Sequence, residues 1–506
     1  MRSAAELRGF ARAAAQALAR QTDISEFEIY AASAEDQVAR IAFTSDIPCR
    51  GVEEFKTLHA DGFQLRIVMR RDPHEVGTAF EAGDFNLAAL HRALKRARRT
   101  TVVDPHFPGL SIAQKTSLPA AAEHGDLSRV SDAVLAECAW QMIGSAIETF
   151  QNSTVSRGEN PGLVMGGDIS IIRDRIALAN SNFSDVRSDE SAHFSSSVTA
   201  IVESLDAKGT AGAIGASRAR LRQASSRLGR DAVRRALTLV DGVRPPSGIY
   251  RVVLGPQPVA EILNYMVMGS LTTGAFHASN SAYQGRFGKR VMDGRLSLLD
   301  DPRARGGAVH RRITCEGIPA RRTDLVRDGY LVGLLSTVYD SHRLETDGAL
   351  GEKLGANGAG AKFPPVSGYR LGEGGGRRFD SHPGSSGTNL IMRARGGISE
   401  REMIRMIKAG IYVGRVWYTY PINCQRAGDF TCTVSGDSYL IRDGMLAEPL
   451  APNSLRINAN VAQIFDAPLA IGARAAAATV WGSPEVYYVP AFAVDALALA
   501  AVGEVG

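Results

Sequence analysis

The chain has 506 residues, of which 44% are hydrophobic and 22% are charged, a composition typical of folded globular proteins. A chain of this length has too many residues for one ordinary hydrophobic core, so we expect two or three domains. The 58 basic and 53 acidic residues leave a formal net charge of +5, too small an excess to indicate a nucleic-acid partner.

Local signals for a membrane span, a disulfide framework and a zinc site are missing from the sequence. No run of 18 or more apolar residues occurs and the N-terminal stretch has no cleavage site, so we expect neither a membrane span nor a signal peptide. Five cysteines, an odd number, favour a reducing cytoplasm. No C-x-x-C pair occurs and no two histidines lie three to five residues apart, so no self-contained zinc site is visible.

The first hundred residues combine helices with extended segments. In residues 62–70 (GFQLRIVMR), Phe63, Leu65 and Ile67 alternate with mostly polar neighbours, which predicts a strand with one buried face. Residues 85–99 predict an amphipathic helix. Its arginine-rich side fits a solvated face, which we favour, or an acidic partner.

Two proline-containing segments predict domain boundaries. The first is residues 101–110, and the second follows a helix that ends at Gly242, before Pro245 and Pro246. A helix and two strands lie between them. The expected domains of this α+β fold are an N-terminal α/β domain over residues 1–107, a central α+β region over 108–244 and a β-rich C-terminal domain over 245–506.

Two hairpins and one helix are well specified in the last 260 residues. Leu325–Gly333 and Leu440–Glu448 both place Asp-Gly between apolar-rich runs, because a tight turn needs positive φ. Ser399 and Glu402 predict a capping box at the start of a helix. The segment Gly355–Gly387 is rich in Gly, Pro and Ser, and we expect it to be mobile unless a ligand or partner orders it.

Sequence motifs with a known catalytic or cofactor-binding mechanism are missing: there is no P-loop, G-x-S-x-G, H-E-x-x-H or Rossmann fingerprint. Cys315 follows His310 in an arginine-rich stretch that could activate a thiol, but a packing role is the better interpretation. Cys424 and Cys432 are eight residues apart with no histidine nearby, which again favours a structural role.

The stretch Pro258–Phe276 (PVAEILNYMVMGSLTTGAF) predicts a helix that is apolar nearly all round, with Asn264 and Tyr265 in its middle. This pattern is typical of a buried core helix.

Several segments, taken in order, resemble the TldD/PmbA family, formerly called modulator of DNA gyrase. They include YRVVLGPQPVAEIL, SAYQGRFGKRVMDGRLSLLDDP, CEGIPARRTDLVRDGYLVG and GDFTCTVSGDSYLIRDGMLAEP, preceded by VEEFKTLHADGFQLRIVM and IALANSN. The resemblance covers nearly the whole chain and implies the fold of that family.

In the TldD branch of the family, the helix matching Pro258–Phe276 carries His-Glu-x-x-x-His, in which two histidines bind zinc and the glutamate is the general base. In this sequence those three positions are Asn264, Tyr265 and Gly269. The cysteine ligand that the branch draws from a Gly-rich C-terminal segment is also missing from ARAAAATVWGSPEVYYVP. The resemblance therefore implies no zinc site of that type. The residues expected to fill the space are Met266, Val267, Met268 and Leu271.

Loss of the motif is characteristic of the PmbA branch, also called TldE. It implies a cytoplasmic pseudo-enzyme without a cofactor, paired as a heterodimer with a zinc-bearing, TldD-like metallopeptidase that processes unfolded peptides or peptide natural products. Two alternatives remain, a stand-alone hydrolase or transferase of the same fold and a homodimeric peptide-binding scaffold. Residues near the old pocket that could serve a stand-alone enzyme are His277, His310, Cys315 and His342.

Peptide binding needs no catalytic side chains, because an extended peptide can add to a sheet edge through main-chain hydrogen bonds. Candidate segments are residues 388–392, which begin with Thr388 and Asn389, and residues 415–420. The second segment contains Trp417, Tyr418 and Tyr420, an aromatic density that suits an interface or a core strand.

Overall fold

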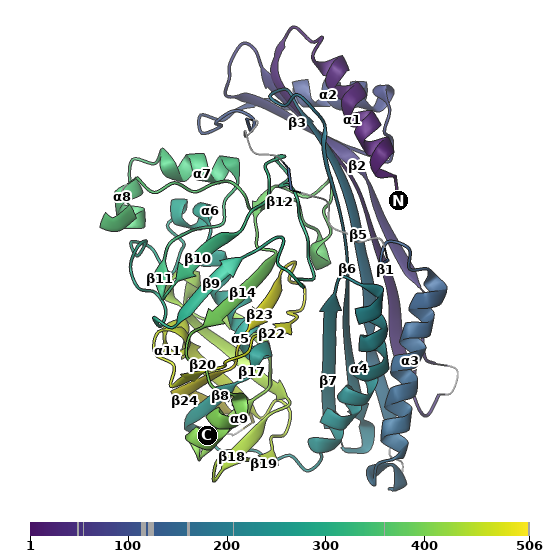
Figure 1. Cartoon of the computed structure of the whole chain (residues 1–506), viewed down its shortest axis with the longest axis vertical. Helices are drawn as coiled ribbons and strands as arrows, with labels where there is room; N and C mark the ends of the chain where they lie inside the picture. Colours follow the sequence, from purple (N-terminus) through teal and green to yellow (C-terminus); the bar gives the residue numbers. More distant parts are fainter. Residues whose placement is uncertain are drawn as a thin grey trace.

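The computed structural model describes residues 1–47, 50–53, 55–112, 118–119, 126–158, 162–205, 207–358 and 360–503. The described residues form three large sheets and one two-stranded ribbon, with helices packed around them (Figure 1). This confirms the mixed helix and strand fold expected from the sequence. Cys49 lies outside the described residues, and the other four cysteines are free thiols.

The first sheet has seven strands in the order β4-β3-β2-β1-β5-β6-β7. Its strands are β1 (Ile24–Thr44), β2 (Lys56–Met69), β3 (Glu75–Ala82), β4 (Val102–Val103), β5 (Leu163–Asn180), β6 (Arg187–Val202) and β7 (Ala207–Gly215). Strand β1 pairs with β2 on one side and with β5 on the other. The expected boundary between residues 107 and 108 therefore falls within a region that shares one continuous sheet, because β1 joins segments from both sides of it.

Four helices cover one face of this sheet, as Figure 1 shows for α3 and α4 beside β6 and β7. The helices are α1 (Ala4–Leu18), α2 (Leu87–Arg99), α3 (Asp132–Gln151) and α4 (Arg218–Thr238). The predicted strand alternation is confirmed, since Phe63, Leu65 and Ile67 are all buried in the core. On β6 the even-numbered residues, such as Phe194 and Val198, pack against α3 and α4. The odd-numbered residues of β6 therefore face the other way.

The rest of the chain builds two sheets that lie against that other face (Figure 1). The nine-stranded sheet comprises β16 (Arg415–Pro421), β17 (Asp429–Gly436), β20 (Leu455–Asn460), β24 (Phe492–Ala501), β8 (Gly248–Leu254), β15 (Gly410–Val413), β18 (Tyr439–Arg442) and β19 (Met445–Pro449), with β21 (Ala470–Ile471) on β24. The six-stranded sheet comprises β11 (Tyr330–Leu331), β10 (Thr323–Arg327), β9 (Leu296–Asp300), β14 (Asn389–Ala394), β23 (Val486–Val489) and β22 (Ala476–Ala478). The ribbon is β12 (Gly368–Tyr369) with β13 (Gly384–Ser385).

Short helices connect these strands. They are α5 (Pro256–Ile262), α6 (Thr273–His277), α7 (Val338–Glu345), α8 (Leu350–Leu354), α9 (Glu400–Ile407), α10 (Cys424–Ala427) and α11 (Val461–Phe465). The predicted capping box is confirmed, because Ser399 and Glu402 bond each other's backbone N–H at the start of α9. Both Asp-Gly hairpins are confirmed as the turns β10–β11 and β18–β19, in which each Asp and each Gly has positive φ.

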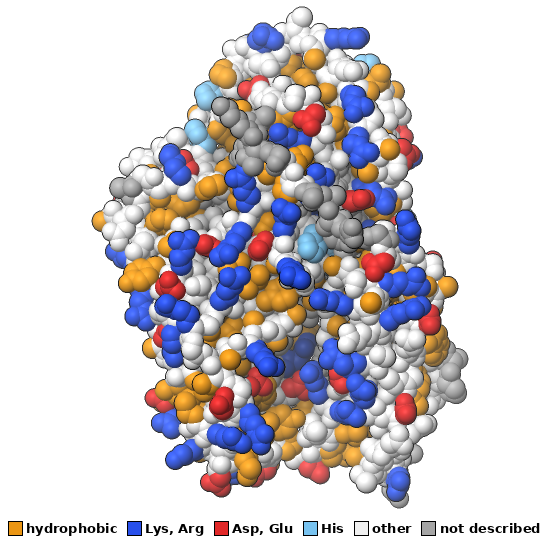
Figure 2. Space-filling view, in the orientation of Figure 1, with side chains coloured by type: hydrophobic (Ala, Val, Ile, Leu, Met, Phe, Trp, Pro, Cys, Tyr) orange, Lys and Arg blue, Asp and Glu red, His pale blue; other side chains and the backbone are white. Residues whose placement is uncertain are grey.

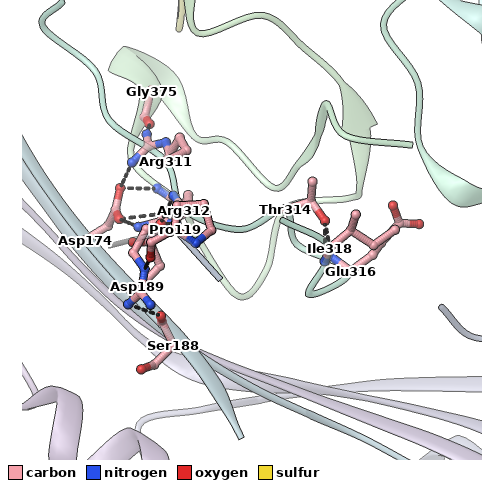
Figure 3. Close-up of polar contacts among 11 residues, drawn as sticks. Pro119, Asp174, Ser188, Asp189, Arg311, Arg312, Thr314, Glu316, Ile318 and Gly375 are labelled. Carbon is pink, nitrogen blue, oxygen red and sulfur yellow. Dashed lines mark hydrogen bonds and ion pairs between the residues drawn. The ribbon is translucent and has the colours of Figure 1, made fainter. Parts of the chain in front are cut away.

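A buried ion-pair network joins the first sheet to the C-terminal part of the chain (Figure 3). Asp174 on β5 accepts hydrogen bonds from Arg311 Nη1 at 2.9 Å and from Arg377 Nε at 2.7 Å. Asp189 on β6 accepts from Arg377 Nη1 at 2.6 Å and from the backbone N–H of Arg312 at 2.9 Å. Because Asp174, Asp189, Arg311 and Arg377 are all buried, the two parts of the molecule are locked together here.

The same network changes the interpretation of the segment Gly355–Gly387. This segment was expected to be mobile unless a ligand or partner orders it. Instead, Tyr369, Arg370 and Arg377 within it are fully buried, and the aspartates of β5 and β6 anchor Arg377. The chain's own contacts therefore order the described residues of this segment.

One further structural finding concerns membranes. Among the residues that the structure describes, no helix is long and apolar enough to cross a bilayer.

Candidate functional site

The sequence predicts one regular helix over Pro258–Phe276, but the structure shows that this stretch is irregular. Helix α5 ends at Ile262 and continues as a π-helical turn over Leu263–Val267 and a 3-10 turn over Met268–Ser270. The widened turn leaves backbone carbonyls without their usual partners. The side-chain Nε2 of Gln425 donates to the carbonyls of Tyr265 at 3.1 Å and Met266 at 2.9 Å. We call residues 256–270 the motif helix.

At two of the three positions of the zinc motif the side chain hydrogen-bonds to another part of the chain, and the third position is a glycine. Asn264 Oδ1 accepts a hydrogen bond from the Tyr487 hydroxyl at 2.8 Å. The Tyr265 hydroxyl donates to the backbone carbonyl of Trp481 at 3.1 Å. Gly269 has no side chain, and a Cβ atom there would lie 3.6 Å from Gln425 Nε2. The Asn and Tyr side chains can form hydrogen bonds, but none of the three positions offers an imidazole or a carboxylate to a metal ion.

The motif helix therefore lacks the residues that would bind zinc in the way expected for the TldD branch. Among the described residues, no three His, Cys, Asp or Glu side chains gather as a metal ion would require. One carboxyl group does lie on this helix, Glu261, but it is buried and bonded to Gln257 Nε2 at 3.1 Å. Burial raises the pKa of Glu261 to about 7, against the opposing charge of Arg415. As expected, the apolar side chains that follow Tyr265 in the chain are buried in the core, namely Met266, Val267, Met268 and Leu271.

A cavity of about 640 Å³ lies between the first sheet and the C-terminal part, next to the motif helix. Figure 2 shows the surface hollowed in this region, with basic and acidic side chains around it. Trp481, which accepts from Tyr265, lines the cavity, and so does Glu485. The Tyr487 hydroxyl lies 3.3 Å from Glu485 Oε2 and donates to Asn264 Oδ1. Tyr265 therefore contacts the cavity wall directly, and Asn264 is connected to it through Tyr487.

The floor of the cavity is the face of the first sheet that helices do not cover. Alternate residues of β6 line it, from His193 through Ser195, Ser197 and Thr199 to Ile201. Their spacing follows from the two-residue period of a strand. Neighbouring strands add further polar and charged lining residues, namely Asp168 from β5 and Lys208 and Thr210 from β7. The floor is thus mostly hydroxyl groups with a few charges.

The opposite wall carries aromatic side chains that remain exposed. The exposed fractions are 75% for Trp481, 70% for Tyr418 and 38% for Trp417. Trp417 and Tyr418 contact each other edge to face, with ring centroids 5.5 Å apart. Exposed aromatics gathered at one cavity are typical of a binding surface.

Tyr418 is held in a strained backbone conformation. Its φ of 55° lies in the left-handed region, which costs free energy for a bulky residue. The pairing of β16 with β17 is irregular between Trp417 and Tyr420, which is where this residue projects. Strand β16 ends the order of the nine-stranded sheet, so its outer edge has no partner strand among the described residues. Tyr420 on this strand is 49% exposed.

The residues 388–392 do not provide a second free edge. Strand β14 pairs with β9 on one side and with β23 on the other. Thr388 and Asn389 are buried, and Asn389 Nδ2 donates to the carbonyls of Asp301 and Val309. The expectation of strand addition at this segment is therefore wrong, because a central strand has no unpaired backbone groups to offer.

The four other candidate residues do not line the cavity. His277 lies 3.5 Å from Asp347, and burial lowers its pKa. Burial also lowers the pKa of His310, whose Nε2 is 3.1 Å from the Gly307 carbonyl. Cys315 is buried and its pKa is raised to about 12, so a thiolate is disfavoured there at neutral pH. His342 lies in α7.

Sequence reasoning missed several residues of this site. Asp168 lies in one of the two strands expected between the proline-containing segments, but nothing in the strand pattern shows which face meets the C-terminal part. Trp481 follows a run of small residues and precedes Gly-Ser-Pro, a signal for an exposed turn that could have drawn attention to it. Gln425 and Tyr487 are distant in sequence from the motif helix, so only the fold brings them to it.

The sequence of the C-terminal part identifies the class of protein. Residues 247–500 match the PmbA/TldA metallopeptidase C-terminal domain. This match covers half of the chain, and the protein therefore belongs to the PmbA/TldD family of metallopeptidase-related proteins.

Individual relatives agree with this assignment. Over 226 residues the chain is 24% identical to the metalloprotease TldD homolog of Haemophilus influenzae, covering 44% of this chain and 40% of that protein. Over 186 residues it is 29% identical to a metalloprotease of Synechocystis, covering 35% of this chain and 34% of the relative. The matched segments thus span less than half the length of either relative.

The fold extends over the whole chain. The crystal structure of TldE from Thermococcus kodakarensis is similar with a TM-score of 0.76, covering 98% of this chain and 100% of that chain at 16% sequence identity. At this identity the likeness concerns the fold alone.

Proposed function

We propose that this protein is the non-catalytic, TldE-like subunit of a heterodimer with a TldD-type metallopeptidase, and that its cavity holds unfolded peptides or peptide natural products. The observation that carries the proposal is the motif helix, in which Asn264, Tyr265 and Gly269 stand where a zinc peptidase needs two imidazoles and a carboxylate. Zinc is expected in the partner subunit.

The cavity supports the binding role. Its volume of about 640 Å³ is within the range of ligand sites. Its floor offers hydroxyl groups, and its wall offers exposed aromatic rings, a combination that can hold an extended chain without catalysis. Strand β16, which contains Trp417 and Tyr418, has one edge without a partner strand among the described residues, and this edge offers main-chain hydrogen bonds.

Native mass spectrometry of the tagged protein, purified gently from its own host, tests the proposal. We expect an equimolar complex with a second chain that carries zinc. A homodimer with stoichiometric metal would overturn the proposal in favour of a stand-alone enzyme. A metal-free homodimer would overturn it in favour of a peptide-binding scaffold.

A further inference from the structure

The cavity floor contains one carboxylate that the protein itself leaves without a partner. Asp168 makes no side-chain hydrogen bond or ion pair with any residue that the structure describes. Its register neighbour on β1 is Arg40, whose guanidinium instead lies 3.6 Å from Glu53. The Asp168 side chain is exposed within the cavity, and the partial loss of solvent there raises its pKa, while the charge of Arg40 acts in the other direction.

The other acidic groups of the cavity already have partners. Asp437 lies 3.1 Å from Arg235. Glu485 accepts from the hydroxyls of Ser386 and Ser483, both at 3.0 Å, and from the backbone N–H of Gly387 at 3.2 Å. Asp168 is therefore the cavity carboxylate that remains available to a ligand.

Apart from Arg40, which lies beside Asp168 on β1 and close to Glu53, the basic groups that line the floor, Lys208 and His193, lie well away from Asp168 along the strands. Asp168 pairs with Ser197 of β6, whereas Lys208 pairs with Ile201, four residues further along. His193 is four residues from Ser197 in the opposite direction. At roughly 3.3 Å per residue, each basic group is about 13 Å from the level of Asp168. Asp168 is thus the charged group that lines the centre of the floor.

The wall of the cavity contributes aromatic rings, which can bind a cation together with the carboxylate. Trp481 and Tyr418 present exposed rings to the same cavity, and the strained backbone of Tyr418 holds one of them there. A cation is attracted to the face of an aromatic ring as well as to a carboxylate. A carboxylate in the same cavity as exposed tryptophan and tyrosine rings, and without a partner among the described residues, favours an ammonium or guanidinium group over a neutral one.

We propose that the cavity is a subsite for a positively charged side chain, lysine or arginine, of an extended peptide, with Asp168 as its counter-ion and Trp481 and Tyr418 as its aromatic walls. The proposal rests on the peptide-binding role proposed above and names the class of peptide. The floor from His193 to Ile201 spans eight residue steps, about 26 Å, which matches an extended peptide of about nine residues.

Calorimetric titration of the full chain with blocked nine-residue peptides tests this inference. The peptides contain Ala, Gly and Ser with a central Lys, Gln or Glu, so that only the charge of one side chain changes. We expect the Lys peptide to bind at least about tenfold more tightly than the Gln peptide, a difference typical of a charge-assisted contact.

The variant Asp168→Asn removes the charge with little change in shape. It should abolish the preference for Lys while leaving the affinity for the Gln peptide unchanged, which also shows that the variant is folded. The control is Asp443→Asn in the exposed β18–β19 turn, where Asn also accepts positive φ, and it should keep the preference.

Two outcomes separate the failure of this inference from the failure of the proposed function. Equal affinity for the Lys and Gln peptides, or tighter binding of the Glu peptide, would overturn the cation subsite while leaving peptide binding in place. Binding of none of the three peptides would overturn both the subsite and the peptide-binding role.

Discussion

Asp168 and Asp174 lie on the same face of one strand, β5, yet their surroundings are opposite. At Asp174 the C-terminal part packs tightly, and two buried arginines hold the carboxylate (Figure 3). Although burial alone would raise it, Arg311 and Arg377 keep the pKa of Asp174 below its ordinary value. At Asp168 the two parts of the molecule separate into a cavity, the side chain is exposed, and partial loss of solvent raises its pKa against the opposing charge of Arg40.

This difference shows how one sheet face serves both structure and binding. A buried charge is tolerated when partners replace the lost solvent, which is the case at the closed end around Asp174. At the open end around Asp168, no described residue provides such a partner, so a ligand can supply it. The ion pairs at the closed end hold the floor and the wall of the cavity together, and the side chains at the open end can contact a ligand.

The largest expected effect comes from breaking the closed end. Asp174→Asn leaves Arg311 and Arg377 buried with less compensating charge, so the free energy of unfolding should fall by about 3–5 kcal/mol. Denaturation followed by calorimetry or circular dichroism measures this loss. The control is Asp495→Asn, which disrupts an exposed pair with Arg251 and should cost no more than about 1 kcal/mol. A similar loss in both variants would show that the network does not lock the fold.

A second prediction concerns Asp300, a carboxyl group that is buried and, among the residues that the structure describes, neither pairs with an arginine nor lines a cavity. Burial raises its pKa to about 7, although Thr388 donates two hydrogen bonds to its Oδ1. The folded state therefore holds a proton that the unfolded state releases near pH 4. Stability should consequently fall as the pH rises from about 4 to about 7 and then level off.

Asp300→Asn isolates this contribution. Asn keeps the oxygen that accepts from Thr388 and stays neutral, so at pH 8 the variant should be more stable than the natural protein by on the order of 2–4 kcal/mol. Near pH 4 the two proteins should be alike. Unfolding curves at pH 4, 6 and 8 measure this difference, and a constant difference across that range would refute the assignment.

The smallest effect is expected at the rim of the open end. Tyr418→Gly relieves a positive φ, so stability should stay unchanged or rise by up to about 1 kcal/mol. Tyr420→Gly, on the same strand without positive φ, should lose about 1 kcal/mol. Thermal unfolding of both variants gives the comparison. If Tyr418→Gly loses as much as Tyr420→Gly, the backbone at Tyr418 is not strained.

Much of the local structure could be predicted from the sequence. The Asp-Gly turns, the capping box of Ser399 and the alternation around Leu65 are signals carried by adjacent residues, and all three are confirmed. The motif positions Asn264, Tyr265 and Gly269 followed from a family resemblance, and the structure shows the contacts that two of their side chains make.

The parts that could not be predicted depend on contacts between distant segments. The π-helical turn at Leu263–Val267 is supported by Gln425, which lies about 160 positions further along the chain. The pairing of Asp174 with Arg377 orders a Gly-rich segment that looked mobile. Likewise, the sequence does not show that β14 is central whereas β16 is at an edge, because strand order is a property of the whole sheet.

The most direct test of the central claim is peptide hydrolysis by the purified chain, expressed without any partner. Unfolded peptides would be incubated with it, with and without added zinc, and the products would be analysed by mass spectrometry. We predict that the peptides bind but remain intact under both conditions, because Asn264, Tyr265 and Gly269 offer neither the zinc ligands nor the general base of the TldD motif, and Glu261 is buried. Zinc-dependent cleavage that a chelator abolishes would contradict the account.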